Sequence, residues 1–252
     1  MPLVPMTQRQ QLPGMLRTFA FLIAALVLPV AGQSEERLLN VRTLCFSYID
    51  DVKSVFVPGE RKGEMLEQEL YTAVYSLPFQ MRATGGKGVF FLPNDDPEKP
   101  YKALPAVELP ATSEILFLFL PSPDKAKSPY RIVALPDDTR SFPYGSVRLM
   151  NLSNHNVRIH MGEHSGGKAV NLTPGKSRLV DSVRKVDGLN RYPVLSEYET
   201  DKGFARFHNT AWRSIKDKRD LAIIYTEPKS GHPRIKHYED AAPADLGSGD
   251  PG

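Results

Sequence analysis

Hydrophobic residues along this chain fall into short runs that alternate with polar residues and end at Gly, Pro, Asn or Asp. Runs of this kind, rich in β-branched and aromatic side chains, predict β-strands. In the first half of the chain the predicted strands cover residues 39–48, 54–57, 66–70, 88–93, 115–120 and 130–135. In the second half they cover residues 146–152, 156–161, 177–181, 193–198, 204–208, 221–226 and 234–238. The pattern therefore predicts an all-β protein.

One segment leaves two structures open. In residues 63–77, "GEMLEQELYTAVYSL", apolar residues recur near helical spacing. The same segment can also form a strand followed by a turn. The sequence alone does not separate these alternatives.

The strand pattern occurs twice along the chain, as an internal repeat. "VRT" at Val41 matches "VRL" at Val147, and "EILFLF" at Glu114 matches "DLAIIY" at Asp220, both at an offset of about 106 residues. After the long strand each half makes a Pro-containing turn and returns as "YRIVALPDD" or "PRIKHYED". We predict two tandem immunoglobulin-like β-sandwich domains, at residues 38–138 and 144–240, with residues 139–143 as the linker, because about 100 residues is the usual size of such a domain. One larger sandwich is the alternative.

The run "ILFLFL", residues 115–120, is apolar on both faces, whereas a strand with one wet face alternates. The facing sheet can cover one side only. The other side needs the second half of the chain, a loop or another subunit, and we expect it to be covered within the chain.

The N-terminal segment predicts export. Arg17 precedes an apolar run from Thr18 to Leu28, and "PVAG" follows with small residues suited to cleavage. We interpret residues 1–32 as a signal peptide, with Met15 as an alternative start. The run is shorter than the roughly 20 residues of a membrane span, so we expect no transmembrane anchor in the mature chain.

Residues 241–252, rich in Ala, Gly, Pro and Asp, predict a disordered tail. The mature protein is expected in the periplasm or outside the cell.

Charge and cysteine content narrow the function. Removing residues 1–32 removes two arginines and no acidic residues, so the net charge falls from +3 to about +1. Without clustered basic charge, we expect no nucleic-acid partner. Cys45, the single cysteine of the chain, lies in an apolar stretch, which predicts a buried, inert thiol.

The sequence "HMGEH", residues 160–164, has the His-x-x-Glu-His spelling of a zinc-peptidase motif. That motif requires a helix, and Gly162 with the following "SGG" argues against one. A weaker metal interpretation stays open, in which His155, His160, Glu163 and His164 hold a divalent ion from a β-hairpin, since imidazole suits zinc, copper or nickel. Exposed loop histidines without a ligand are the alternative. We expect no resident cofactor beyond such weak metal binding.

Other candidate sites are less specific. Asn151 and Asn171 lie in "NLS" and "NLT", which are glycosylation acceptors only in a eukaryotic secretory pathway. Two adjacent carboxylate pairs, "DD" at 95–96 and at 137–138, point apart on a strand or turn and form no acid–base couple by themselves. Four aromatic residues could form a binding platform or part of the core: Phe207, Trp212, Tyr225 and Tyr238.

The stretch "FPYGSVRLMNLSNHNVRIHMG…LTPGKSRLV" resembles a recurring exported β-sandwich domain of unknown function in bacterial surface and periplasmic proteins. Those domains share a "GSVRxxNxS" opening strand, a short hairpin and a Pro-Gly turn. The match covers about 40 residues of the second half. It implies a fold and a compartment, and it brings no catalytic residues.

These observations predict an exported, non-enzymatic β-sandwich protein that binds or scaffolds an unidentified protein or glycan partner. The first alternative is a periplasmic divalent-metal-binding protein that uses the His155/His160/His164 hairpin. The second is a hydrolase that acts on glycan or peptide, with carboxylates that converge only in three dimensions.

The metal interpretation has a direct test. We expect the melting temperature of the mature chain to be the same with EDTA, zinc or copper, and the same in a His160→Ala, His164→Ala double variant, because exposed loop histidines bind no ion tightly. Differential scanning calorimetry measures it. Stabilisation by one metal that disappears in the double variant would establish the metal site instead.

Overall fold

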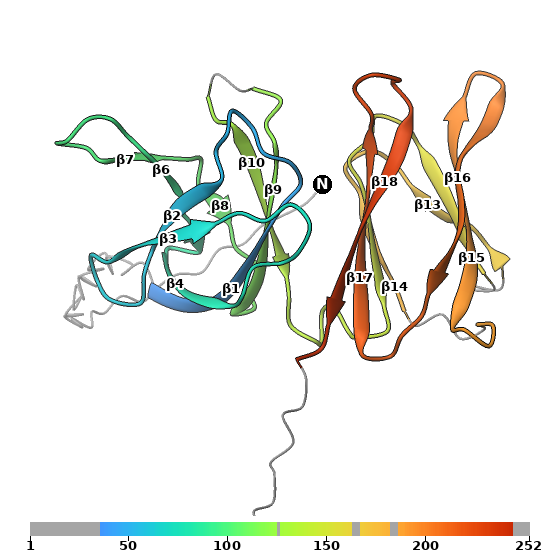
Figure 1. The fold of residues 1–252 in the computed structure, drawn as a ribbon, viewed down its shortest axis with the longest axis horizontal. Helices are drawn as coiled ribbons and strands as arrows, with labels where there is room; N and C mark the ends of the chain where they lie inside the picture. The colour runs from blue at the N-terminus through green and yellow to red at the C-terminus, as the bar shows by residue number, and fades with distance from the viewer. Residues whose placement is uncertain (1–35, 125–126, 163–166, 182–185, 244–252) are drawn as a thin grey trace, which may run out of the picture. The chain divides into compact units, whose positions relative to one another are not determined.

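The computed structural model describes residues 36–124, 127–162, 167–181 and 186–243, and every long regular element in these ranges is a β-strand (Figure 1). Among the described residues, ten strands precede residue 137: β1 Glu36–Cys45, β2 Ser54–Pro58, β3 Met65–Glu69, β4 Phe79–Thr84, β5 Lys87–Gly88, β6 Phe91–Pro93, β7 Tyr101–Ala103, β8 Val107–Glu108, β9 Glu114–Pro121 and β10 Tyr130–Pro136. Eight follow residue 146: β11 Val147–Asn151, β12 Val157–Met161, β13 Val170–Leu172, β14 Ser177–Val180, β15 Arg191–Thr200, β16 Gly203–Arg213, β17 Lys218–Thr226 and β18 Pro233–Ala241.

The strands form four sheets, two from each set. Strands β10-β9-β1-β4-β5-β8 and β14-β11-β17-β18 make what we call the contact sheets, and β3-β2-β6-β7 and β13-β12-β15-β16 make the outer sheets. Each contact sheet packs on the outer sheet of its own half, which gives a first and a second sandwich. The prediction of an all-β chain of sandwiches is confirmed.

The two sandwiches share one topology. In the first, β1 lies between β4 and β9, antiparallel to β4 and parallel to β9, and β10 closes the sheet edge. In the second, β11 lies in the same way between β14 and β17, and β18 takes the place of β10. The internal repeat in the sequence is therefore a repeat of strand order. Residues 65–69, left open between helix and strand, form β3 because they pair along β2.

Each sandwich has its own apolar core. In the first, the inward side chains of β1, β2, β4 and β9 meet, with Phe90, Phe117 and Phe119 packed edge to face. Cys45 is buried in this core, as predicted, and burial raises the pKa of its thiol. In the second, strands β11 to β17 supply mainly Val, Ile and Leu around Tyr192 and Trp212. Two independent cores explain why the strand pattern repeats.

A third apolar cluster joins the sandwiches through the outward faces of the two contact sheets. Along β9, Ile115, Phe117 and Phe119 enter the first core, while the alternate residues enter this joint. Its buried members come from six strands and both halves of the chain: Leu44, Leu116, Leu118, Leu120, Leu135, Met150, Leu221, Ile223 and Tyr238. The expectation that the second face of residues 115–120 is covered within the chain is confirmed.

Two sequence predictions lie largely outside the described residues: the signal peptide of residues 1–32 and the tail of residues 241–252, of which only 241–243 are described. Within the described ranges, no helix has the length and hydrophobicity that crossing a bilayer requires.

We expect Leu118→Ala to lower the free energy of unfolding by about 2–5 kcal/mol, because Leu118 is 0% exposed and its removal leaves a cavity in the joint between the sandwiches. Urea unfolding followed by circular dichroism measures the change. Leu77→Ala is the matched control, since Leu77 is 85% exposed and its loss should leave the midpoint almost unchanged. Equal midpoints for the two variants would contradict a buried joint.

Candidate functional site

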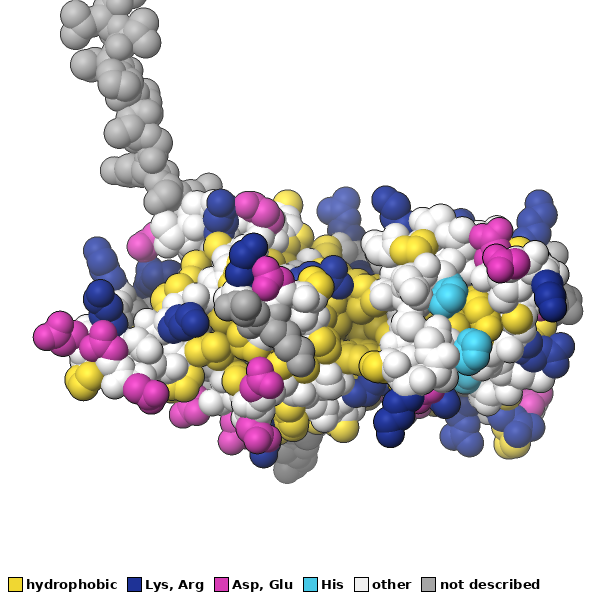
Figure 2. Space-filling view, turned by 90° about the horizontal axis from the view of Figure 1, so that it is seen from above, with side chains coloured by type: hydrophobic (Ala, Val, Ile, Leu, Met, Phe, Trp, Pro, Cys, Tyr) yellow, Lys and Arg dark blue, Asp and Glu magenta, His cyan; other side chains and the backbone are white. Residues whose placement is uncertain are grey.

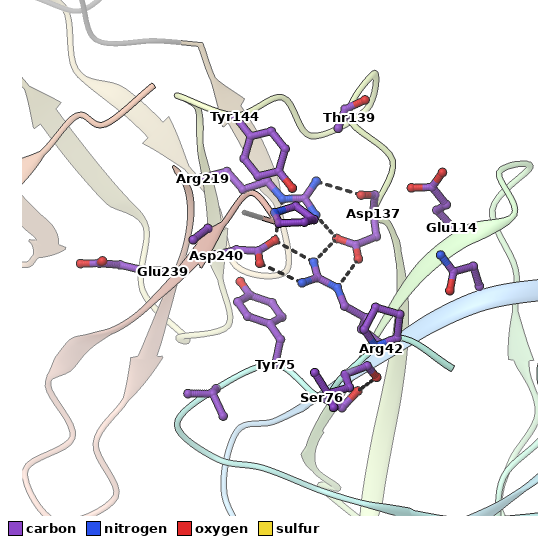
Figure 3. Close-up of a pocket in the computed structure, with 16 residues that line it drawn as sticks. Arg42, Tyr75, Ser76, Glu114, Asp137, Thr139, Tyr144, Arg219, Glu239 and Asp240 are labelled. Carbon is purple, nitrogen blue, oxygen red and sulfur yellow. Dashed lines mark hydrogen bonds and ion pairs between the residues drawn. The ribbon is translucent and has the colours of Figure 1, made fainter. Parts of the chain in front are cut away.

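A cavity of about 590 Å³ opens beside the joint and takes side chains from both sandwiches (Figure 3). Two arginines and two aspartates of its lining are joined to one another, and they come from four places in the chain. Arg42 lies on β1, Asp137 directly follows β10, Arg219 lies near the start of β17, and Asp240 lies near the end of β18. We call these four residues the ion network.

Arg42 binds both carboxylates of the network. Its Nε and Nη2 donate to the two Asp137 oxygens at 2.8 and 3.0 Å, and its Nη1 and Nη2 donate to the two Asp240 oxygens at 2.8 and 2.7 Å. The guanidinium of Arg42, from the first sandwich, therefore holds an aspartate from each sandwich in a bidentate pair, the strongest geometry for an Arg–carboxylate interaction.

Arg219 closes the network from the second sandwich. Its Nε donates to Asp240 Oδ2 at 2.7 Å and its Nη2 to Asp137 Oδ1 at 2.8 Å. Its Nη1 donates to the backbone carbonyls of Asp137 and Phe142, each at 2.8 Å. Two positive and two negative charges thus alternate around one point, and every guanidinium nitrogen of Arg219 has a partner.

The network is largely excluded from water. The side chains of Arg219, Asp240, Asp137 and Arg42 are 4%, 7%, 8% and 16% exposed. Burial alone would raise the pKa of Asp240, but the hydrogen bonds from Arg42 and Arg219 outweigh it and hold this pKa below its usual value. Burial also opposes the charge of Arg42, whose pKa is nevertheless raised by Asp240 and Asp137.

The segment between the sandwiches is packed against this network. Phe142, within the predicted linker 139–143, is 1% exposed. The guanidinium carbons of Arg148 and Arg219 lie 4.4 and 4.7 Å from the centre of its ring, and Arg148 donates to the carbonyls of Pro136 and Ser141. The connection is therefore fixed by cation–π and hydrogen-bond contacts.

The repeat explains why two aspartates meet here. Aligning "YRIVALPDD" with "PRIKHYED" places Asp137 opposite Asp240, each at the end of the last strand of its sandwich. Because the two contact sheets face one another, these equivalent ends come together at one place. The sequence contained this signal, but interpreting 137–138 only as an adjacent carboxylate pair missed it.

The environment of Asp137 and Asp240 favours a structural role for these carboxylates over proton transfer. A carboxylate that acts as a general acid needs a raised pKa, whereas the pKa of Asp240 is lowered and both aspartates are engaged by arginines. Tyr75 lies under Arg42, its ring centre 4.8 Å from the guanidinium carbon, and its buried hydroxyl makes no hydrogen bond within the described residues. Burial, with Asp240 nearby, raises the pKa of Tyr75 and keeps it neutral.

The histidines predicted to bind metal are separated where the structure describes them. His155 precedes β12 and its Nε2 lies 3.1 Å from the carbonyl oxygen of Gly231, while His160 lies near the other end of β12 with its Nε2 3.5 Å from Glu197. Five strand residues span about 16 Å. Glu163 and His164 lie outside the described residues, and no group of three or more metal-ligating side chains occurs within them.

The four candidate platform aromatics do not share a surface. Trp212 and Tyr238 are 6% and 2% exposed and belong to two different apolar clusters. Tyr225 packs edge-on against Phe46 from the first sandwich. Phe207 is half-buried beside Tyr198. Trp212 lies on strand β16, where its ring stacks on His237 at 4.8 Å. Trp212 and Tyr238 are therefore core residues, which is the alternative that the sequence left open.

Comparisons with known proteins give no family. No protein-family model matches the chain, and no curated protein sequence does. Two solved structures from Bacteroides uniformis and Bacteroides ovatus, of proteins whose names associate them with cell adhesion, align with 10% and 11% identity. They cover 85% and 83% of this chain and 99% of each of theirs, with TM-scores of 0.20 and 0.22. These values are too low to support an argument about function.

We expect Asp240→Asn to lower the free energy of unfolding at pH 7 by about 3–5 kcal/mol, because two buried arginines lose a charged partner. The lowered pKa of Asp240 means that its contribution is present above the unfolded-chain pKa of about 3.9 and is lost as the pH falls through the lower folded-state pKa. The gap between wild type and variant should therefore narrow below about pH 4. Urea unfolding at a series of pH values measures this gap.

Glu36→Gln is the control for that experiment. Glu36 pairs with Arg82 at 2.7 Å, but its side chain is 49% exposed, so the change should stay below about 1 kcal/mol. A loss as large as that of Asp240→Asn, or a gap that stays constant in acid, would contradict a buried network.

Proposed function

We propose that this chain is a binding or scaffolding protein without enzymatic activity that works outside the cytoplasm. The observation that carries the proposal is the ion network. Arg42 and Arg219 each bind both Asp137 of the first sandwich and Asp240 of the second. The apolar joint lies beside this network. Side chains that link two folded units in this way stabilise a fixed spacing between the surfaces that those units present.

The chemistry of the cavity supports a role without turnover. Asp137 and Asp240, whose side chains are 8% and 7% exposed, each accept hydrogen bonds from both Arg42 and Arg219. Releasing either carboxylate for acid–base work would leave a buried guanidinium unpaired, which costs several kcal/mol. This cost favours a structural role for the ion network over a role as proton donor or acceptor.

The predicted signal peptide supports export, and the cysteine content is compatible with it. With Cys45 alone, the fold needs no disulfide, and the three apolar clusters provide the burial that stabilises it. A partner would meet the outer sheets and the loops, because both contact sheets are used to join the sandwiches.

We expect the full chain, produced in a Gram-negative host, to be recovered from the periplasm with a new N-terminus near Gly32, because the apolar run and small residues before that position suit signal cleavage. Cell fractionation and N-terminal sequencing measure this. A Leu22→Arg, Ile23→Arg variant, which interrupts the apolar run, is the control and should stay uncleaved. Cytoplasmic protein that keeps Met1 would contradict export.

The same purified protein tests the absence of turnover. We expect no hydrolysis of chromogenic glycosides or fluorogenic peptides above that of an Asp240→Asn preparation, and saturable binding to at least one immobilised glycan or surface protein. Hydrolysis that co-purifies with the chain and disappears in a carboxylate variant would overturn the non-enzymatic proposal.

A further inference from the structure

A second cavity, of about 340 Å³, lies at one end of the second sandwich, away from the ion network. It is bounded by strands β15 and β16 and by the turn between β17 and β18. Its lining combines cationic, aromatic and hydroxyl side chains: Tyr198, Arg206, Phe207, Ser230, His232, Pro233 and Arg234. Figure 2 shows histidine side chains beside hydrophobic ones on the face of the second sandwich seen from this end. We call this cavity the loop pocket.

The aromatic wall of the loop pocket is held in place before any ligand arrives. The Tyr198 hydroxyl lies 2.9 Å from Nδ1 of His232, and its ring meets His155 edge-on at 4.9 Å. His155 in turn holds the β17–β18 turn through the Gly231 carbonyl, 3.1 Å from its Nε2. Tyr198 is thus fixed between histidines from two separate loops, which lowers the entropy lost on binding.

The charge of the loop pocket favours an anion. Arg206 is exposed and, within the described part of the chain, its side chain makes no hydrogen bond or ion pair. Arg234 uses its Nε for Glu227, 2.9 Å away, and its side chain is 61% exposed. Glu227 accepts a hydrogen bond from the Ser230 hydroxyl, the main reason that its pKa is lowered, and its charge is balanced by Arg234. On β15, Glu197 is the register partner of Arg206, and its carboxylate is already paired with Arg158 at 2.6 Å. Arg206 therefore remains as a guanidinium without a partner among the described residues, beside the exposed Arg234–Glu227 pair.

The combination of groups identifies a ligand class. A guanidinium recognises a carboxylate through two parallel hydrogen bonds, and the half-buried rings of Tyr198 and Phe207, 6.1 Å apart, offer an apolar surface beside it. His232 and Ser230 add polar groups for hydroxyls. Small-ligand sites combine an apolar wall with a few convergent polar groups in this way. We infer that the loop pocket binds a carboxylate-bearing saccharide, an inference that rests on the binding role proposed above.

The inference is tested by titrating the full chain with trigalacturonic acid and with its fully methyl-esterified form, using isothermal titration calorimetry. We expect saturable binding of the acid, and binding of the ester at least about tenfold weaker, because esterification removes the charge that the arginines recognise. Equal affinity for the two forms, or no binding of the acid, would overturn the inference.

Variants locate the site. Arg206→Gln should weaken binding of the acid about tenfold or more, and Tyr198→Phe should weaken it less, since the ring remains and only the hydroxyl contact with His232 is lost. Arg213→Gln is the matched control: it is an exposed arginine on the same strand, β16, outside the loop pocket, and should bind as the wild type does. Circular dichroism verifies that each variant is folded.

The outcomes separate this inference from the proposed function. If the acid binds equally well to Arg206→Gln and to Arg213→Gln, the loop pocket is not the site, while a binding role for the chain still stands. If neither form of the saccharide binds but the chain binds another immobilised component, the ligand class is wrong and the broader proposal survives.

Discussion

The structure depends on two strands that are apolar on both faces. Strand β9 directs Ile115, Phe117 and Phe119 into the first core and its three leucines outward, and β17 divides its apolar residues in the same way. An outward row of large apolar side chains on a central strand is unstable in water unless another surface covers it. Each contact sheet covers the other, so neither sandwich is complete in isolation.

The ion network adds orientation to this apolar contact. Apolar surfaces attract without direction, whereas an Arg–carboxylate pair is satisfied in few geometries. Taking charges from water costs free energy that their pairing only partly offsets, so the network is better understood as fixing the register between the sandwiches than as the source of their association. Phe142, packed under Arg148 and Arg219, ties the connecting segment to the same point.

Because the joint uses both contact sheets, function is left to the remaining surfaces. The cavity beside the joint has its carboxylates committed to arginines, whereas the loop pocket has an arginine with no partner in the described chain and an aromatic wall set in advance. Both cavities contain arginines and aromatic rings. They differ in whether the guanidinium groups are already satisfied, and this difference separates a structural clamp from a surface that can accept a ligand.

The sequence by itself determined the β-strands, the two-fold repeat and the need to cover both faces of residues 115–120, because these follow from residue types at local spacing. Local spacing did not decide between helix and strand for residues 65–69, where pairing with β2 selects the strand. It predicted partners for His155 within its own hairpin, whereas folding places His155 beside Tyr198 and next to the turn that carries His232. Aligning the two repeats places Asp137 opposite Asp240, but only the tertiary structure decided that they share two arginines. A contact such as that of Arg42 with Asp240, 198 residues apart, depends on how the sheets pack.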